Sequence, residues 1–318
     1  MNEKIKSVLG NFSRFGLSGV LLWWLYTKID VEQTVKVLKS ADLKFIFYAL
    51  IFFFVINLIL IVRWFVFIKA LDLQAPFWVA VRYYLAGLFG NLFLPSAIGG
   101  DVIKILGICR TSSQKPKVVA SVILDRLSGF AGMVVVATVS FILGFRLIQD
   151  LSVFILIVGM AVTSTGIAMV LLNETAYSFC CQIFGRFPKF KDSLMRMHYD
   201  IALVKGRQGS IVQAVLLSAF SQLTLAVTFF LVSKALHQNV SLFYFIIFIP
   251  LICVVATVPS IGGLGVREAG AAYFFGKVGV ASGIAVSISL INFLFMVLVG
   301  LLGGFLYLVI QPPEEKIV

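Results

Sequence analysis

The feature that most constrains this chain is a series of apolar runs, each long enough to cross the hydrocarbon core of a membrane. A helical span needs about 20 apolar residues. Of the 318 residues 60% are hydrophobic and 13% are charged, whereas soluble domains are about 25% charged. This excludes a soluble enzyme, a nucleic-acid-binding module and a disordered tail, and predicts an integral membrane protein. The predicted spans are residues 13–29, 44–62, 118–144, 151–172, 210–235, 242–258 and 279–309.

Residues 77–108 form an apolar segment of a different kind, because polar and helix-breaking residues interrupt it. This pattern predicts a broken or re-entrant helix pair. The last run, 279–309, fits one tilted helix or two short ones. We therefore expect an all-α, polytopic integral membrane protein with about 7–8 transmembrane helices, folded as a single transmembrane domain over residues 1–318.

The Lys and Arg residues are distributed unevenly over the predicted loops. There are 26 of them against 14 Asp and Glu, a net charge of +12. If the N-terminus is cytoplasmic and residues 77–108 enter and leave on one side, 15 cations lie inside and six outside. The positive-inside rule then predicts a multi-pass protein of the cell membrane with a cytoplasmic N-terminus. Residues 173–209 mix aromatic and basic side chains and are expected to form an amphipathic cytoplasmic loop, either merely solvated or recruiting lipid headgroups.

Two interrupted regions carry the same residues in the same order. In each, Pro-Ser leads to Ile-Gly-Gly, and a cation follows the second glycine by four residues. Coincidence in a glycine-rich chain is the alternative, and the shared order argues against it. The pattern predicts an internal repeat with halves at about 44–172 and 210–309, either parallel or inverted. The helix-breaking residues are Pro95, Gly99 and Gly100 in the first copy and Pro259, Gly262, Gly263 and Gly265 in the second.

Each copy of this motif is expected to break a helix inside the membrane. Proline cannot donate a backbone hydrogen bond, and glycine tolerates a positive φ. Backbone opened at that depth is stable only when it is buried in protein or lines a wet cavity. Discontinuous helices in corresponding positions of two halves mark a transporter's binding site. The two breaks therefore predict a substrate cavity.

Six charged side chains in or beside the apolar segments point to the same place, since each would cost about 2.5–3.5 kcal/mol if isolated at a helix centre. They are expected to share one polar cavity. Asp125 and Arg126 are adjacent, so each needs a partner from another segment, and Asp101 or Asp125 is the expected partner of Arg267. For any one of them, a buried ion pair between helices is the alternative to substrate contact. The predicted substrate-binding residues are Asn91, Ser96, Asp101, Lys104, Asp125, Arg126, Ser260, Arg267 and Glu268.

The sequence gives little support for a metal or a cofactor. The four cysteines lack zinc-ligand spacing, and the two histidines are 39 positions apart. The nucleotide-binding pattern G-x-x-x-x-G-K-[ST] does not occur. The small residues Gly129, Gly132, Gly300 and Gly304 are expected to let helices approach closely, without a further role.

Three stretches stand out in combination: NLFLPSAIGGDVIK at 91–104, the Asp125-Arg126 pair inside a span, and VPSIGGLGVREAG at 258–270. Together they resemble the lysylphosphatidylglycerol synthase transmembrane-region family, also called flippase-like domain proteins. The resemblance implies a membrane region that moves an aminoacylated phospholipid, or in other relatives a polyprenol-linked sugar carrier, between leaflets. Bifunctional members add a cytosolic synthase domain, for which a sequence ending at Val318 is expected to have no room.

The expected function is a lipid flippase or transporter that moves its lipid through the charged cavity without covalent chemistry. Its substrate would be an anionic or aminoacylated phospholipid or a polyprenol-linked lipid, whose phosphate the cations would bind. The alternatives are a membrane-embedded transferase acting on a lipid or polyprenol-linked substrate and an accessory subunit for another enzyme. No nucleic acid is expected as a partner, whereas a second copy of the chain and a separate lipid-modifying enzyme both remain open.

Overall fold

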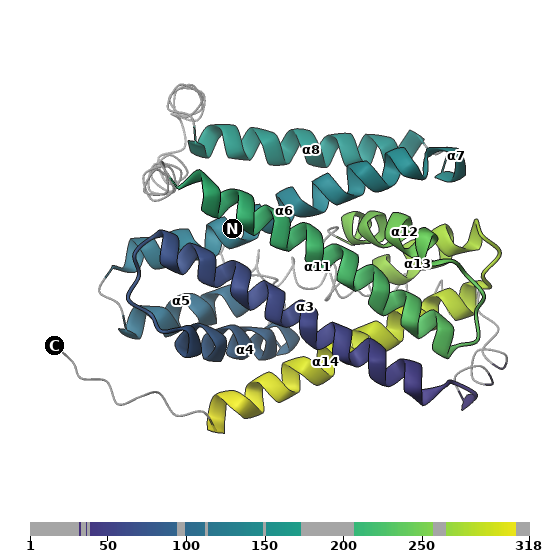
Figure 1. Cartoon of the computed structure of the whole chain (residues 1–318), viewed down its shortest axis with the longest axis horizontal. Helices are drawn as coiled ribbons and strands as arrows, with labels where there is room; N and C mark the ends of the chain where they lie inside the picture. The colour runs from purple at the N-terminus through teal and green to yellow at the C-terminus, as the bar shows by residue number, and fades with distance from the viewer. Residues whose placement is uncertain are drawn as a thin grey trace, which may run out of the picture.

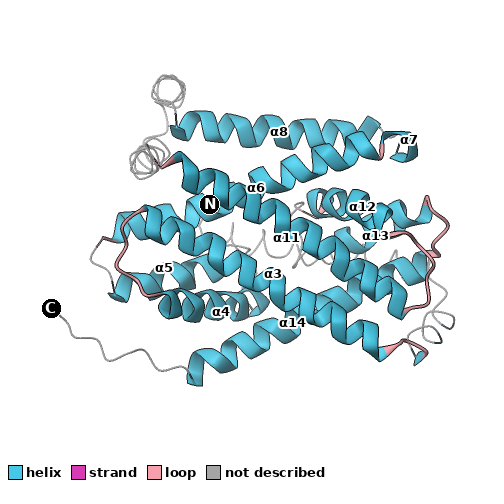
Figure 2. Ribbon diagram, viewed as in Figure 1, coloured by secondary structure: helices cyan, strands magenta, loops and turns pink. Residues whose placement is uncertain are grey.

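The computed structural model describes residues 32, 36, 39–93, 99–111, 114–148, 151–172, 207–256 and 265–309. The regular structure in these residues is entirely helical (Figure 2), which confirms the all-α prediction. The helices are α3 (Leu43–Ala70), α4 (Phe77–Phe93), α5 (Gly99–Thr111), α6 (Lys115–Leu143), α7 (Phe145–Ile148), α8 (Leu151–Leu172), α11 (Gln208–Ala235), α12 (Leu242–Val255), α13 (Val266–Gly276) and α14 (Ser282–Val309).

Four of these helices, α3, α6, α11 and α14, are long and apolar enough to cross a membrane. They contain the predicted spans 44–62, 118–144, 210–235 and 279–309, apart from a few terminal residues. The last run is therefore one long helix and not two short ones. Helix α8 coincides with the predicted span 151–172, and the predicted span 13–29 lies outside the described residues. The chain is a polytopic membrane protein.

Local sequence explains where several helices begin. The Asp42 carboxylate accepts a hydrogen bond from the backbone N–H of Lys44 at 2.9 Å, which caps α3. The Ser241 hydroxyl accepts one from the N–H of Phe243 at 3.4 Å and caps α12. Pro116 stands in the first turn of α6, where the missing N–H of proline costs no helical hydrogen bond. These features fix where α3, α6 and α12 begin.

Helices α4 and α5 form an antiparallel hairpin. Near its tip Gly87 lies against Gly100, and further out Tyr83 lies against Gly107, so the two arms run in opposite directions. Both outer ends of the hairpin therefore lie at one end of the molecule (Figure 1). This is the arrangement expected of a segment that enters and leaves on the same side.

Helices α12 and α13 form a second antiparallel hairpin. The rings of Phe248 and Phe274 are 5.6 Å apart, those of Phe245 and Phe275 are 4.7 Å apart, and Gly270 lies against Ile252. The prediction of a full span at 242–258 is therefore wrong. With 14 residues, α12 is about 21 Å long at 1.5 Å per residue, which is shorter than the hydrocarbon core of about 30 Å.

Each hairpin carries its own apolar core. The first core surrounds α4 and α5 and includes Trp64, Phe67 and Ile108 among its fully buried side chains. The second surrounds α12 and α13 and includes Phe248 and Phe275. The long helices α3, α6 and α11 each contribute residues to both cores (Figure 1). The two hairpins, whose arms are shorter than the long helices, are thus firmly packed. Their packing holds the charged side chains at defined positions.

Candidate functional site

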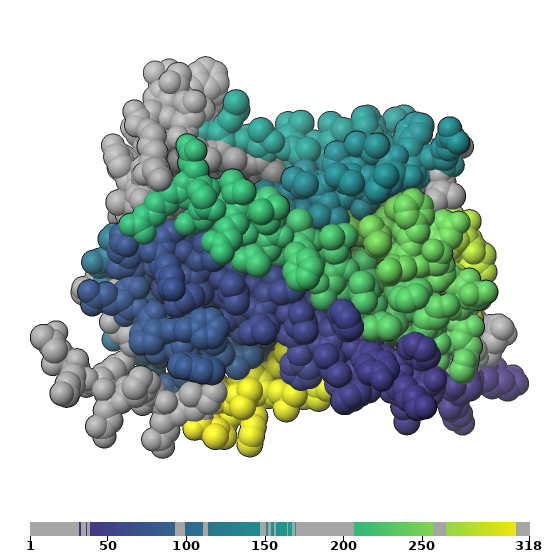
Figure 3. Space-filling model, in the orientation of Figure 1, coloured from purple at the N-terminus to yellow at the C-terminus, as the bar shows by residue number. Residues whose placement is uncertain are grey.

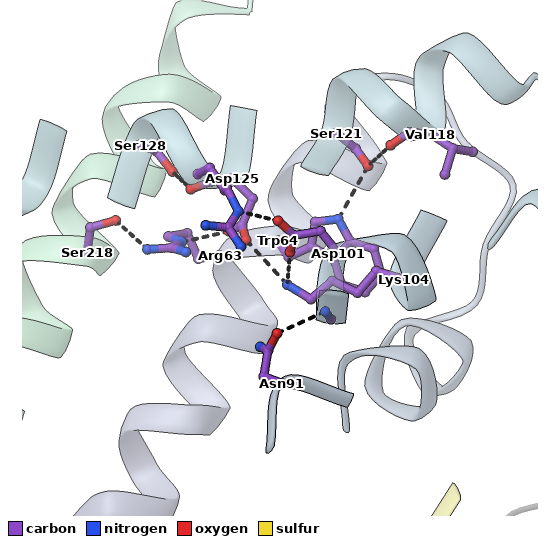
Figure 4. A network of polar contacts seen from close by, with 12 residues as sticks. Arg63, Trp64, Asn91, Asp101, Lys104, Val118, Ser121, Asp125, Ser128 and Ser218 are labelled. Atoms are coloured by element: carbon purple, nitrogen blue, oxygen red, sulfur yellow. Dashed lines mark hydrogen bonds and ion pairs between the residues drawn. The ribbon is translucent and has the colours of Figure 1, made fainter. Parts of the chain in front are cut away.

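Helices α5 and α6 bring four of the predicted residues together, and Figure 4 labels three of them, Asp101, Lys104 and Asp125. Arg126 of α6 donates to the carboxylate of Asp101 on α5. The ammonium of Lys104, one turn further along α5, lies 3.6 Å from Asp101 and 3.7 Å from Asp125 of α6. Asp125 and Arg126 thus each have a partner from another segment, as predicted. We call Arg63, Asp101, Lys104, Asp125 and Arg126 the first network.

Arg63 of α3 is the member of the first network that sequence reasoning missed. Its Nε donates to Asp125 Oδ1 at 2.7 Å, and its Nη1 donates to the Ser218 hydroxyl of α11 at 3.0 Å. A Cβ on Gly129 would lie 3.0 Å from the same Nη1, so the glycine makes room for the guanidinium. Arg63 therefore joins α3, α6 and α11 through side-chain contacts.

Lys104 sits in an aromatic enclosure. Its ammonium is 4.5 Å from the ring centre of Tyr84 and 5.2 Å from that of Trp64, and the residue is buried. A cation over an aromatic face is attracted by the negative charge of the ring face, most strongly where water is excluded. The Trp64 ring is held in turn by a 3.3 Å hydrogen bond from its Nε1 to the Ser121 hydroxyl. This enclosure keeps the lysine between two carboxylates.

Asn91 and Gly100 act at the junction of the first hairpin. The side-chain Oδ1 of Asn91 accepts a hydrogen bond from the Gly100 N–H at 2.8 Å, which satisfies a free donor in the first turn of α5. Gly99 and Gly100 lie within α5, and neither has a positive φ. The expectation that a positive φ makes glycine necessary at these two positions is therefore wrong. A Cβ on Gly100 would instead overlap the Gly87 carbonyl oxygen and the Asn91 amide.

The second hairpin carries a second network, formed by Gly265, Arg267, Glu268 and Ser289. Arg267 donates through Nη2 to Glu268 at 2.9 Å and through Nε to the Ser289 hydroxyl of α14 at 2.9 Å. The prediction that Asp101 or Asp125 is its partner is therefore wrong, because the carboxylate next to it in sequence takes that place. The two networks lie on different helices, so the single shared cavity expected for all six charges is not what the structure shows.

Glu268 has a structural position at the start of α13. Its fully buried carboxylate accepts the Gly265 N–H at 2.6 Å and the Ser289 O–H at 2.8 Å, in addition to Arg267. Gly265 precedes the helix with a φ of 84° and a ψ of −51°, which side-chain-bearing residues rarely adopt. Gly265 thus stands directly before α13 in a conformation that favours glycine. Glu268 reaches back to the residue before the helix, as in a capping box.

Several predicted residues lie outside the described part of the chain. They are Pro95, Ser96, Pro259, Ser260, Gly262 and Gly263, together with most of the 173–209 loop. Their roles as helix-breaking, substrate-binding or headgroup-recruiting residues stay predictions. Within the described residues, no three His, Cys, Asp or Glu side chains gather as metal ligands would.

Of the four glycines predicted to let helices approach closely, Gly132, Gly300 and Gly304 do so, whereas Gly129 makes room for the Arg63 guanidinium; Gly303, which was not predicted, also serves packing. A Cβ on Gly303 of α14 would lie 2.7 Å from the Leu85 carbonyl oxygen of α4, and one on Gly304 would overlap the Phe89 ring. Gly132 of α6 lies in the same way against Ser218 of α11. These glycines bring α14 onto α4 and α6 onto α11.

Comparison with known proteins gives one family and one relative. The family described as "Lysylphosphatidylglycerol synthase TM region" matches residues 11–304. A protein named UPF0104 membrane protein PH1989, from Pyrococcus horikoshii, is 30% identical over 162 residues, which are 50% of this chain and 46% of that protein. The match thus spans about half the length of this curated relative. No solved structure matches the chain.

Proposed function

Since this chain belongs to the lysylphosphatidylglycerol synthase transmembrane-region family, whose role is lipid-related and lies in the membrane, we propose that it is a lipid flippase. It moves a lipid with an anionic headgroup between leaflets, and the first network binds the headgroup phosphate. The headgroup belongs to a phospholipid, which is aminoacylated in some relatives, or to a polyprenol-linked lipid. The acyl or prenyl chains stay outside the first network, on the side of the surrounding hydrocarbon.

The observation that carries this proposal is the charge of the first network. Three cations, Arg63, Lys104 and Arg126, face two carboxylates, Asp101 and Asp125. Four of the five side chains are at most 11% exposed. An unbalanced positive charge among membrane-spanning helices is costly, and a bound phosphate would offset it. Charge-assisted hydrogen bonds from arginine to phosphate are also about twice as strong as neutral ones.

Arg126 is the member of the first network best placed to meet a headgroup. Its side chain is 38% exposed, whereas that of Asp101, its partner, is 11% exposed. Asp101 holds the guanidinium at the start of α5, next to the tip of the first hairpin. We propose that the headgroup enters beside this tip, contacts Arg126 first, and is then stabilised by Lys104 and Arg63.

The test is lipid translocation by the purified protein in vesicles of phosphatidylcholine and phosphatidylglycerol. A fluorescent phosphatidylglycerol should move between leaflets unchanged, and Arg126→Gln should slow it at least tenfold. Arg110→Gln is the matched control, because Arg110 is an exposed cation at the other end of α5. A covalently altered lipid would favour the membrane-embedded transferase. A translocation rate equal to that of protein-free vesicles would contradict the flippase.

The proposal extends to location and partners. The cation distribution supports a cell-membrane location with the N-terminus in the cytoplasm. Translocation as proposed needs the lipid and this chain, without nucleic acid or a cofactor. A second copy of the chain, or a separate enzyme that modifies the lipid, would bind outside the first network. Mass spectrometry of lipids that copurify with the protein would identify the headgroup.

A further inference from the structure

The helices of the second half repeat those of the first at a nearly constant distance along the chain. A long helix, a half-length hairpin and another long helix follow one another twice, as α3, α4, α5, α6 and as α11, α12, α13, α14. Corresponding boundaries of the first two helices lie 165 residues apart. These boundaries are Leu43 and Gln208, Ala70 and Ala235, and Phe77 and Leu242.

The turns after the first long helix of each half agree in sequence and in backbone conformation. Residues 69–72 read Lys-Ala-Leu-Asp, and residues 234–237, again 165 positions later, read Lys-Ala-Leu-His. Asp72 has a φ of 53° and His237 one of 57°, and they are the two non-glycine residues with a positive φ in the described part of the chain. In both turns the next N–H bonds back to the carbonyl five residues earlier. Such agreement indicates a duplication.

The two halves are inverted relative to each other. Helices α3 and α11 lie side by side and run in opposite directions (Figure 1), since the N–H of Asp42 bonds to the carbonyl of Ala235 at 2.9 Å while Arg207 bonds to the carbonyl of Lys69 at 3.0 Å. The first hairpin follows the end of α3 and the second follows the end of α11. They therefore enter the molecule from opposite ends, and the second network is the counterpart of the first.

One pair of corresponding contacts breaks this symmetry. Helix α6 of the first half packs closely on α11 of the second, where a Cβ on Gly132 would lie 3.0 Å from the Val215 carbonyl oxygen. The corresponding helix α14 packs on α4 and contacts α3 at few points, among them the rings of Phe53 and Phe295, whose centres are 6.0 Å apart. In Figure 3 its atoms emerge beside α4 and beneath α3. A groove of about 180 Å³ separates α3 from α14 and is lined by Phe54, Asn57, Leu58, Ile61, Leu85, Val299, Leu302, Gly303 and Leu306.

The lining of this groove fits an acyl chain. Asn57 is its one polar side chain, and the Asn57 amide donates to the Phe53 carbonyl of its own helix at 2.8 Å. Leu58 is 54% exposed and Leu302 is 40% exposed, on two helices that are long enough to cross the membrane. The groove thus opens to the hydrocarbon, where lipid tails are the available apolar ligand.

We propose that the two halves exchange conformations during transport, so that the α3–α14 groove and the α6–α11 contact open alternately. In the state seen here the α3–α14 groove is open and holds a tail of the transported lipid, while α6–α11 is closed. In the other state α14 closes on α3 and α6 separates from α11, which opens a corresponding groove related by the inverted symmetry. This inference rests on the proposed function and specifies its mechanism.

The test measures distances between spin labels on exposed positions, in a background without the native cysteines. Leu58→Cys with Leu302→Cys spans the groove, and Val135→Cys with Leu216→Cys spans the α6–α11 contact. Phe243→Cys with Tyr273→Cys, within the second hairpin, is the control. All six residues are at least 40% exposed. The protein is measured in bilayers of phosphatidylcholine with increasing phosphatidylglycerol.

The expected result is two distances for each of the first two pairs and one for the control. As phosphatidylglycerol changes the populations of the two states, the fraction of molecules with the long α6–α11 distance should rise by as much as the fraction with the long α3–α14 distance falls. A single short α6–α11 distance in every bilayer, or simultaneous lengthening of both pairs, would overturn the exchange. Because the labels report conformation and not transport, exchange without translocation in vesicles would contradict the flippase proposal and the role of the exchange in transport, while the exchange of conformations itself would stand.

Discussion

At the scale of single residues, the first network depends on Arg63, which gives Asp125 its shortest ion pair. The sequence predicted that Asp125 needs a partner from another segment but placed Arg63 in a loop. The predicted span 44–62 ended one residue before it, because a cation usually marks the end of a span. In the structure α3 continues to Ala70. The signal available was the apolar run after Arg63, Trp-Phe-Val-Phe-Ile.

We predict that Arg63→Gln destabilises the protein more than a surface substitution does. The Asp125 carboxylate, which is 4% exposed, would keep only the more distant Lys104, and breaking a buried ion pair from one side costs about 3–5 kcal/mol. Thermal unfolding in detergent should show a lower midpoint, and adding Asp125→Asn should recover much of the loss. Arg110→Gln should leave the midpoint unchanged. An unchanged midpoint for Arg63→Gln would mean that the pair contributes nothing.

A second residue-scale prediction separates the two networks. Arg267→Gln leaves the fully buried Glu268 without its cation, so the unfolding midpoint should fall. Glu268→Gln should restore it in the double variant, because the amide oxygen can still accept from the Gly265 N–H while the amide NH2 can donate to the Ser289 hydroxyl oxygen. Asp125→Asn should not restore it. Rescue by Asp125→Asn and not by Glu268→Gln would show that Arg267 belongs to the first network.

At the scale of elements, the lengths of the apolar runs predict α3, α6, α8, α11 and α14 well, because a span of the membrane requires them. The second hairpin was missed for a physical reason. Residues 242–258 are apolar throughout, and composition does not distinguish a short buried arm from a full span. Its pairing with α13 depends on ring contacts such as Phe248 with Phe274, which are tertiary. The first hairpin was predicted because polar residues interrupt it.

The two hairpins need their glycines for different reasons, which gives a prediction for Gly265→Ala. Its φ of 84° and ψ of −51° are outside the regions that alanine adopts readily, and such strain costs about 1–3 kcal/mol. Gly276→Ala is the control, because a Cβ there would meet nothing within 4 Å. We expect a lower unfolding midpoint for Gly265→Ala alone. Equal midpoints would mean that the backbone before α13 relaxes without cost.

At the scale of the whole molecule, the inverted arrangement could not be read from the motifs alone. With 242–258 counted as a full span and the path of the broken segments open, the repeat could be either parallel or inverted. As the first arm of a hairpin, α12 no longer counts as a crossing. The antiparallel contact of α3 with α11 settles the relative direction of these two helices independently of any count. Sequence thus located the repeat, and tertiary contacts supplied its orientation.

The orientation of the two ends of the molecule provides the last prediction. Gln74 follows α3 and Asn239 follows α11; both are exposed and are 165 residues apart. Because α3 and α11 are antiparallel, the two positions lie at opposite ends of the molecule. A cytoplasmic N-terminus places Gln74 inside the cell and Asn239 outside. In a background without native cysteines, an impermeant maleimide should label Asn239→Cys in intact cells and Gln74→Cys only after permeabilisation.

Each alternative pattern of labelling identifies a different error. The reverse pattern would retain the inverted fold but place the N-terminus outside, so the cation distribution would not determine the orientation. Labelling of both positions from the same side would contradict the antiparallel spans themselves, because α3 and α11 each cross the membrane once and in opposite directions. The permeabilised sample controls for reactivity, since a cysteine that reacts in neither sample reports burial and not sidedness.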